Sequence, residues 1–141
     1  MKVADILQKK GFSVYSVNSE TTVYEALQIM SEKNIGALLV IDDEQLSGIM
    51  SERDYARKII LKGKTSQDTL VKEIMTANPI SVTPKDSLEN CMELMSQKHI
   101  RHLPVTNDNE ILGMISIGDV VKSIIHQQQE TIDYLQSYIA Q

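Results

Sequence analysis

A seven-residue stretch occurs twice in this chain, at positions 65 residues apart. The copies are Gly48-Ile-Met-Ser-Glu-Arg-Asp54 and Gly113-Met-Ile-Ser-Ile-Gly-Asp119, and both read glycine, two apolar residues, serine, two residues and aspartate. The same offset continues without a gap over residues 17–60 and 82–125. Internal repetition on this scale indicates two copies of one structural unit. We therefore expect two diverged repeats, each about 60 residues long, to make up most of the 141-residue chain.

Each repeat has the pattern of a β-α-β-β-α unit. A helix is expected after Thr22, which forms a capping-box pattern with Glu25, and in the second repeat after Asp86. Apolar residues at helical spacing follow both starts and predict one buried face. These residues are Val23, Ala26, Leu27 and Met30 in the first repeat and Leu88, Cys91, Met92 and Met95 in the second. Extended segments are expected at 13–17, 37–41 and 46–50, and again at 80–83, 102–106 and 111–115. The order predicts an α/β (α+β) fold, with helices against a mixed sheet.

The segments that open the two repeats are related by a different offset. Val3-Ala-Asp-Ile6 matches Val71-Lys-Glu-Ile74 at 68 positions rather than 65. The first repeat therefore carries three additional residues, around positions 9–12. We expect a first repeat over residues 1–63, a second over 64–126 and a helical extension over 127–141.

The repeated Ser-x-x-Asp element has two readings. Serine at a helix N-cap with aspartate three residues later is a sound cap, and the carboxylate also favours the helix dipole. The same groups can bind a nucleotide, because a carboxylate accepts hydrogen bonds from ribose hydroxyls and the start of a helix attracts phosphate. We carry both readings for Ser51 with Asp54 and for Ser116 with Asp119.

Basic side chains distinguish the surroundings of the two copies. Arg101 and His102 precede Pro104 at the start of an expected strand, where a plain core strand is not expected to carry them. The matching positions of the first repeat are Gly36 and Ala37. Arg53 lies in the first turn of a helix, where a cation is unfavourable for the dipole, so we expect it to bind phosphate. The alternative for Arg53 is a surface pair with Glu52 or Asp54, and for Arg101 and His102 a solvated, hydrogen-bonded strand end.

The helix after the second copy is expected to run past the repeat. Its positions 121, 125, 128, 132, 135 and 139 are spaced 4-3-4-3-4, and all are apolar except Gln128. This spacing is a heptad seam, in which one polar residue can set the register. The helix either folds back onto its own domain or pairs with a second copy. Because the rest of this segment is polar, we slightly prefer the second alternative, a homodimer.

Composition excludes several classes of function. The net charge of −5 argues against a nucleic-acid surface. The chain has one cysteine, Cys91, so it has no internal disulfide, and we expect this thiol in the core. No signal peptide or membrane-spanning apolar run is evident, which predicts a soluble cytoplasmic protein with no membrane partner. The three histidines and Cys91 lack metal-ligand spacing, and no nucleophile-base set stands out, so neither a metal site nor an enzyme is expected.

Several motifs together resemble a tandem pair of cystathionine-β-synthase-type (CBS) domains. They are residues 48–55, Lys72-Glu-Ile-Met-Thr76, Ile100-Arg-His-Leu-Pro-Val105 and residues 113–121, in the order found in that family. The resemblance covers about residues 1–126 and includes no attached enzyme or transporter domain. It implies two β-α-β-β-α repeats packed about a pseudo-twofold axis, with two clefts between them.

In this family such clefts bind adenosine-containing ligands, and some members bind no known ligand. The resemblance implies that the backbone from Ile100 to Pro104 meets the adenine edge, that basic side chains there reach phosphate, and that Asp119 holds ribose. The expected ligand is AMP, ADP or ATP, with NADH or S-adenosylmethionine as alternatives, and no cofactor is required.

The two clefts are expected to differ, with the better nucleotide site in the second repeat and Ser51, Arg53, Asp54, Gly36 and Ala37 at the weaker one. The function expected is a regulatory adenine-nucleotide sensor that acts on a partner protein. The alternative is a ligand-free dimeric interaction module.

Overall fold

The opening segment of each repeat packs with the other repeat. The computed structural model describes residues 1–12 and 14–140, and the chain divides into two compact units. Unit 1 comprises residues 1–12, 81–107 and 112–140, and unit 2 comprises residues 14–80 and 108–111. Helix α1 (Val3–Lys10) contributes to the core of unit 1, and helix α4 (Val71–Ile74) contributes to the core of unit 2. The compact units therefore follow spatial packing and cross the sequence repeats 1–63 and 64–126.

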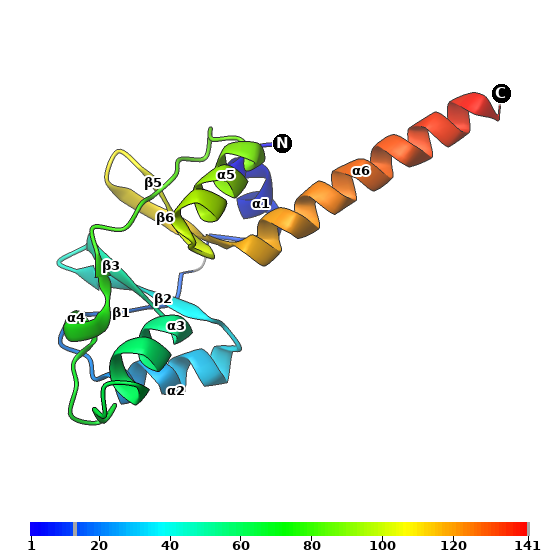
Figure 1. Ribbon diagram of the computed structural model, residues 1–141. Helices are drawn as coiled ribbons and strands as arrows, with labels where there is room; N and C mark the ends of the chain where they lie inside the picture. Colours follow the sequence, from blue (N-terminus) through cyan, green and yellow to red (C-terminus); the bar gives the residue numbers. More distant parts are fainter. Residues whose placement is uncertain (13, 141) are drawn as a thin grey trace. The chain divides into compact units, whose positions relative to one another are not determined.

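Unit 2 contains a mixed four-stranded sheet, as the sequence predicted (Figure 1). Strands β1 (Ser16–Val17), β2 (Ala37–Asp42), β3 (Gln45–Ser51) and β4 (Thr76–Ala77) lie in that order. β1 pairs with β2 in parallel, whereas β2–β3 and β3–β4 are antiparallel. A Cβ atom at Gly48 would lie 2.7 Å from the carbonyl oxygen of Thr76, so the close approach of β4 requires glycine here. The glycine of the repeated stretch thus has a steric role in this unit.

The helices of unit 2 begin at the caps expected from the sequence. Helix α2 (Val23–Lys33) begins after Thr22, whose hydroxyl accepts the N–H of Glu25 at 3.2 Å. It ends at Asn34, which adopts a left-handed conformation with φ of 54°. Helix α3 (Glu52–Tyr55) continues into the π-helical turn η1 (Ala56–Ile60). The buried residues of the unit 2 core are Val17, Val23, Ala26, Met30, Leu38, Val40, Met50, Ile59, Val71 and Ile74.

Unit 1 joins helices α1 and α5 (Leu88–Lys98) to strands β5 (His102–Asn107) and β6 (Glu110–Ser116) and helix α6 (Ile117–Ile139). β5 and β6 form a two-stranded sheet. Cys91 is fully buried, which confirms its expected place in the core. The buried residues of the unit 1 core are Val3, Ile6, Leu7, Val82, Leu88, Cys91, Met95, Leu103, Val105, Ile115 and Val120.

Three local expectations in the second repeat were wrong. Ser87, not Asp86, caps α5: its hydroxyl accepts the N–H of Asn90 at 3.1 Å, because the Asp86 carboxylate instead accepts the N–H of Thr83 at 2.7 Å in the preceding turn. Met92 lies beside the buried stripe of α5 and is 37% exposed. The extended segment expected at 80–83 contains only a single bridge, from Val82 to Val105. In the first repeat, Ser13 lies outside the described residues, and the expected strand 13–17 is reduced to Ser16–Val17.

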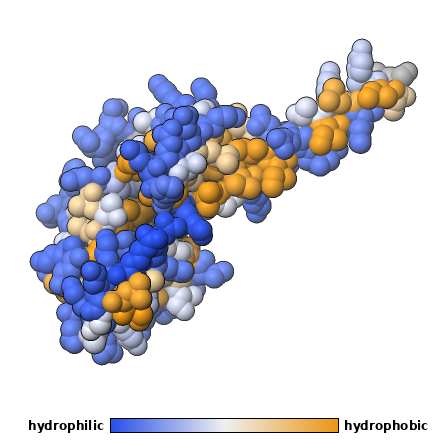
Figure 2. All heavy atoms as spheres, in the orientation of Figure 1, coloured by the Kyte–Doolittle hydropathy of each residue, from blue (hydrophilic) through white to orange (hydrophobic). Residues whose placement is uncertain are grey.

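Helix α6 continues far beyond the core of unit 1. Val120 is buried and Ile124 packs against the core, but residues 125–140 are all exposed. Figure 1 shows the C-terminal half of α6 projecting from the rest of its unit, and Figure 2 shows apolar side chains recurring along it. The fold-back alternative for this helix is therefore wrong. The expected pairing with a second copy stays a prediction.

Candidate functional site

Both copies of the repeated stretch form helix caps. In unit 2 the Ser51 N–H donates to Oδ2 of Asp54 at 2.9 Å, and the Asp54 N–H donates to the Ser51 hydroxyl at 3.3 Å. In unit 1 the corresponding distances between Ser116 and Asp119 are 2.9 and 3.1 Å. These are reciprocal capping boxes at the starts of α3 and α6. The cap reading is confirmed for both copies, and ligand contact stays a prediction.

A lysine contacts the aspartate of each capping box, but the two lysines come from different parts of the chain. Nζ of Lys58, one turn along the same helix, lies 3.3 Å from Oδ1 of Asp54 and donates to the carbonyl of Ile74 at 2.7 Å. In unit 1, Nζ of Lys10 at the end of α1 lies 2.7 Å from Oδ2 of Asp119 and donates to the carbonyl of Met114 at 2.8 Å. Sequence reasoning missed both contacts.

The Lys10–Asp119 pair is accessible to solvent. The Lys10 side chain is 40% exposed and that of Asp119 is 27% exposed. Burial raises the pKa of Asp119, but the hydrogen bonds from Lys10 and from the N–H of Ser116 together lower it by more. The net shift of the pKa is downward, so the carboxylate is ionised at neutral pH. Ion pairs this exposed contribute about 0–1 kcal/mol to stability. Loss of this ion pair would therefore cost the fold little stability.

Arg101 and His102 lie in the same unit as Asp119. The carbonyl of Arg101 accepts the N–H of Ile117 at 2.8 Å, which joins the start of β5 to the first turn of α6. The Arg101 side chain is exposed and that of His102 is half-buried. Burial lowers the pKa of His102, and the nearby charge of Lys10 lowers it further, against an opposing effect of Asp119. His102 is thus neutral at pH 7, and the permanent positive charges of this cluster are Arg101 and Lys10.

Ile100 lies just before strand β5 of unit 1, and Pro104 lies within it. The N–H of Ile100 donates to the carbonyl of Met95 at 3.1 Å, and its side chain packs against the core. Pro104 is buried in β5, and its carbonyl accepts the N–H of Val82 at 3.0 Å. Both positions are structurally constrained, which is compatible with the backbone role expected of them but does not test it.

The cluster in unit 2 has its two cations, Arg53 and Lys58, on helix α3 and the turn that continues it, and no cation at the start of strand β2. The carbonyl of Gly36 accepts the N–H of Glu52 at 3.1 Å, the same link that Arg101 makes to α6 in unit 1. Ala37 is fully buried, so its side chain offers no polar group. Arg53 and Asp54 are half-buried in α3. The two clusters therefore differ in where their cations lie, because Arg101 precedes strand β5 in unit 1 whereas Gly36 precedes strand β2 in unit 2.

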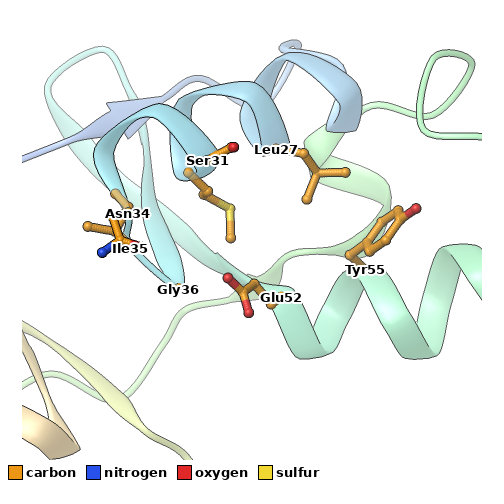
Figure 3. Close-up of a pocket in the computed structure, with 8 residues that line it drawn as sticks. Leu27, Ser31, Asn34, Ile35, Gly36, Glu52 and Tyr55 are labelled. Atoms are coloured by element: carbon orange, nitrogen blue, oxygen red, sulfur yellow. The ribbon is translucent and has the colours of Figure 1, made fainter.

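Unit 2 also contains an open pocket of about 510 Å³ between α2 and α3. Figure 3 shows the Glu52 carboxylate and the Tyr55 ring of α3 on one side, with Leu27 and Ser31 of α2 on the other. Gly36 is the member of its lining that the sequence analysis named as a site residue, whereas Arg53 and Asp54 do not line it. The apolar helix stripe was the available signal for this pocket. The lining residues are Leu27, Met30, Ser31, Asn34, Ile35, Gly36, Glu52 and Tyr55.

Within the part of the chain that the structure describes, no three His, Cys, Asp or Glu side chains are grouped so as to hold a metal ion. Over residues 1–12 and 14–140, no helix is both long and apolar enough to cross a membrane.

Comparison with known proteins gives consistent matches. The CBS-domain model matches residues 3–61 and 71–126. The CBS domain-containing protein CBSX3, mitochondrial, of Arabidopsis thaliana is 40% identical over 97% of this chain and 71% of its own length. A solved protein with CBS domains from Burkholderia ambifaria is 46% identical, with a TM-score of 0.87 over 91% of this chain and 96% of its own.

A third match was solved with ligands. The CBS domain pair of MJ0100, in complex with 5′-methylthioadenosine and S-adenosyl-L-methionine, is 26% identical, with a TM-score of 0.77 over 90% of this chain and 98% of its own. The cytoplasmic location expected from the sequence stays a prediction. The two matched segments and the similarity over most of the chain lead to one conclusion: this chain belongs to the CBS-domain family, as a tandem CBS pair.

Proposed function

We propose that this CBS pair is a regulatory module that binds an adenine nucleotide, AMP, ADP or ATP, and has no catalytic activity of its own. NADH and S-adenosylmethionine are the alternative ligands. The observation that carries the proposal is the cluster at the start of α6, where the ionised carboxylate of Asp119 lies with Arg101, His102 and Lys10 in one unit. Such a cluster suits a ligand that has both a ribose diol and a phosphate. The diol can donate hydrogen bonds to the carboxylate, and the phosphate can pair with the permanent positive charges.

The capping boxes limit which groups can serve the phosphate. The N–H groups of Ile117 and Asp119 already donate to Arg101 and Ser116, so they are occupied within the protein. The Gly118 N–H lies between them in the same turn, and in this proposal the positive charge for a phosphate comes from side chains, chiefly Arg101. In this proposal Asp119 accepts the ribose hydroxyls, Ser116 adds a hydroxyl, and the backbone from Ile100 to Pro104 borders the base.

The second cluster is proposed as the weaker site. Asp54 is capped by Ser51 and contacted by Lys58, with Arg53 beside it, but the strand start offers Gly36 and Ala37 in place of Arg101 and His102. A phosphate there would lack the basic side chain that Arg101 provides at the strand start of unit 1, although Arg53 lies on the helix. We expect lower affinity at this site or no occupancy.

Thermal unfolding with AMP, ADP, ATP, NADH and S-adenosylmethionine tests the proposal. A ligand that binds only the folded state stabilises it by about 2.7 kcal/mol at a hundredfold excess over its dissociation constant. We expect a concentration-dependent rise in Tm with at least one adenine nucleotide. No rise with any of the five ligands would favour the interaction module instead. Mass spectrometry of small molecules that co-purify with the protein would identify the ligand.

A specific observation favours self-association as an additional property. In the exposed part of α6, the heptad seam places Ile125, Ile132 and Ile139 at a positions and Gln128 and Leu135 at d positions. Isoleucine at a with leucine at d favours a parallel two-stranded coiled coil.

The charges of this segment also allow a second copy to approach. Glu130 and Asp133 occupy outer positions f and b, while the flanking e and g positions contain the uncharged Gln129, Thr131 and Gln136. No like charges therefore oppose each other at this seam. We propose a homodimer in which α6 pairs with its copy.

A further inference from the structure

Lys10 belongs to the segment in which the first repeat differs in length from the second. The opening motifs match at an offset of 68 and the rest at 65, so three additional residues fall around positions 9–12. Helix α1 ends here, at Gly11, whose φ of 93° is accessible to glycine and whose N–H donates to the carbonyl of Leu7 at 2.7 Å. The additional residues therefore extend the end of α1 and carry Lys10 with it.

This position brings Lys10 to the start of α6 within unit 1. Its ammonium nitrogen donates to Oδ2 of Asp119 at 2.7 Å and to the carbonyl of Met114 at 2.8 Å. The same Oδ2 accepts the Ser116 N–H at 2.9 Å. The oxygen of Asp119 that faces Lys10 is thus already hydrogen-bonded twice. A ribose diol that approaches this oxygen competes with an internal cation.

The result of that competition depends on the charge of the ligand. A neutral nucleoside that displaces Lys10 leaves an ammonium group without its counter-ion. A nucleotide provides a phosphate to which the displaced Lys10 can pair, beside Arg101, because four rotatable side-chain bonds allow the ammonium group to move. The Lys10 side chain is 40% exposed, so this movement requires no unpacking of the core.

We propose that Lys10 is a specificity-determining residue of the nucleotide site, pairing with Asp119 when the site is empty and with phosphate when it is filled. This inference rests on the proposed function, because it assigns ribose to Asp119. It predicts discrimination in favour of AMP and against adenosine. A lysine that only joins α1 to α6 would affect both ligands equally.

Isothermal titration of AMP and adenosine into the wild type, Lys10→Met and Lys10→Arg tests the inference. We expect the wild type to prefer AMP, and Lys10→Met to reduce the ratio of the two affinities at least about tenfold, as expected for loss of a charged hydrogen bond. Lys10→Arg should retain most of the preference. Lys9→Met is the matched control, because Lys9 is the exposed neighbour on the same helix turn, and it should leave the ratio within about twofold.

The outcomes separate this inference from the proposed function. If the wild type binds neither AMP nor adenosine, both fail for this ligand class. If it binds AMP and Lys10→Met leaves the ratio unchanged, the Lys10 inference alone is overturned. Should Lys10→Met not fold, the same ratio measured for Lys10→Gln decides the matter, because glutamine also removes the ammonium charge while it can still donate to Asp119.

Discussion

The ammonium nitrogen of Lys10 lies 2.7 Å from Oδ2 of Asp119, although the two residues are 109 positions apart in the chain. The corresponding aspartate of unit 2, Asp54, is contacted by Lys58 from one turn away on its own helix. Two copies of one sequence motif are therefore neutralised by lysines of different origin. In unit 2 this contact is local to α3 and η1, whereas in unit 1 it depends on the packing of α1.

Asp119→Asn should weaken AMP binding about tenfold or more, because it removes the charged carboxylate whose oxygens are proposed to accept hydrogen bonds from the ribose hydroxyls. Asp54→Asn is the matched change at the equivalent cap and should alter AMP affinity less than about threefold. Both variants should lose about 0.3–1 kcal/mol of stability through the helix dipole. Titration calorimetry and urea unfolding measure the two effects. Equal loss of AMP binding in both variants would contradict the assignment of the better site to unit 1.

His102 should titrate below its ordinary pKa of 6.5, because burial and the charge of Lys10 both disfavour protonation. The unfolded state then binds more protons than the folded state below that pH, so stability should decrease as pH falls through about 6.5. NMR titration of the His102 ring in Lys10→Met should give a higher pKa than in the wild type, with Lys9→Met as control. An unchanged pKa in Lys10→Met would show that Lys10 does not act on His102.

Ile132→Asp should weaken self-association at least about tenfold, because it places a charge at an a position of the α6 seam. Tyr134→Asp introduces the same charge at an outer position of the helix, where Tyr134 is 70% exposed, and should leave association unchanged. Analytical ultracentrifugation over a range of protein concentrations measures the difference. The same dissociation constant for both variants would argue against pairing through this seam.

Gly48→Ala should destabilise the protein by about 1–3 kcal/mol, the range for overpacking a filled site. The new methyl group would lie 2.7 Å from the Thr76 carbonyl oxygen and 2.8 Å from the Met75 sulfur. Gly118→Ala is a useful contrast, because its Cβ would meet only the Ser116 hydroxyl oxygen at 3.6 Å and alanine favours helix by up to about 1 kcal/mol. Urea unfolding of both variants should show changes of opposite sign. A neutral Gly48→Ala would mean that β4 can move away from β3.

Local patterns predicted most of the fold correctly. The offset of 65 identified the repeat, and the Ser-x-x-Asp spacing identified both capping boxes, because a cap depends on residues three positions apart. The cap of α5 was assigned one residue too early, since Asp86 and Ser87 are adjacent and either can cap. Their different partners are decided by the turn before the helix.

Contacts between distant segments could not be predicted from those patterns. The length difference at residues 9–12 was visible in the sequence, but its effect depends on α1 packing in unit 1. The openers also pack with the opposite repeat, which no local periodicity encodes. For the candidate site, the capping geometry is confirmed, and the ligand roles of Asp119, Arg101 and His102 await the binding measurements.

Because each opening segment packs with the other repeat, the order of segments along the chain differs from their grouping in the two compact units. Helix α1 precedes unit 2 along the chain, yet its partners in unit 1 are residues 81–107 and 112–140, which follow the main segment of unit 2. Most of unit 2 is already present once residue 80 has been made. Most of unit 2 can therefore fold before the partners of α1 have been made, and the apolar residues Val3, Ile6 and Leu7 are buried only after residues 81–140 have followed.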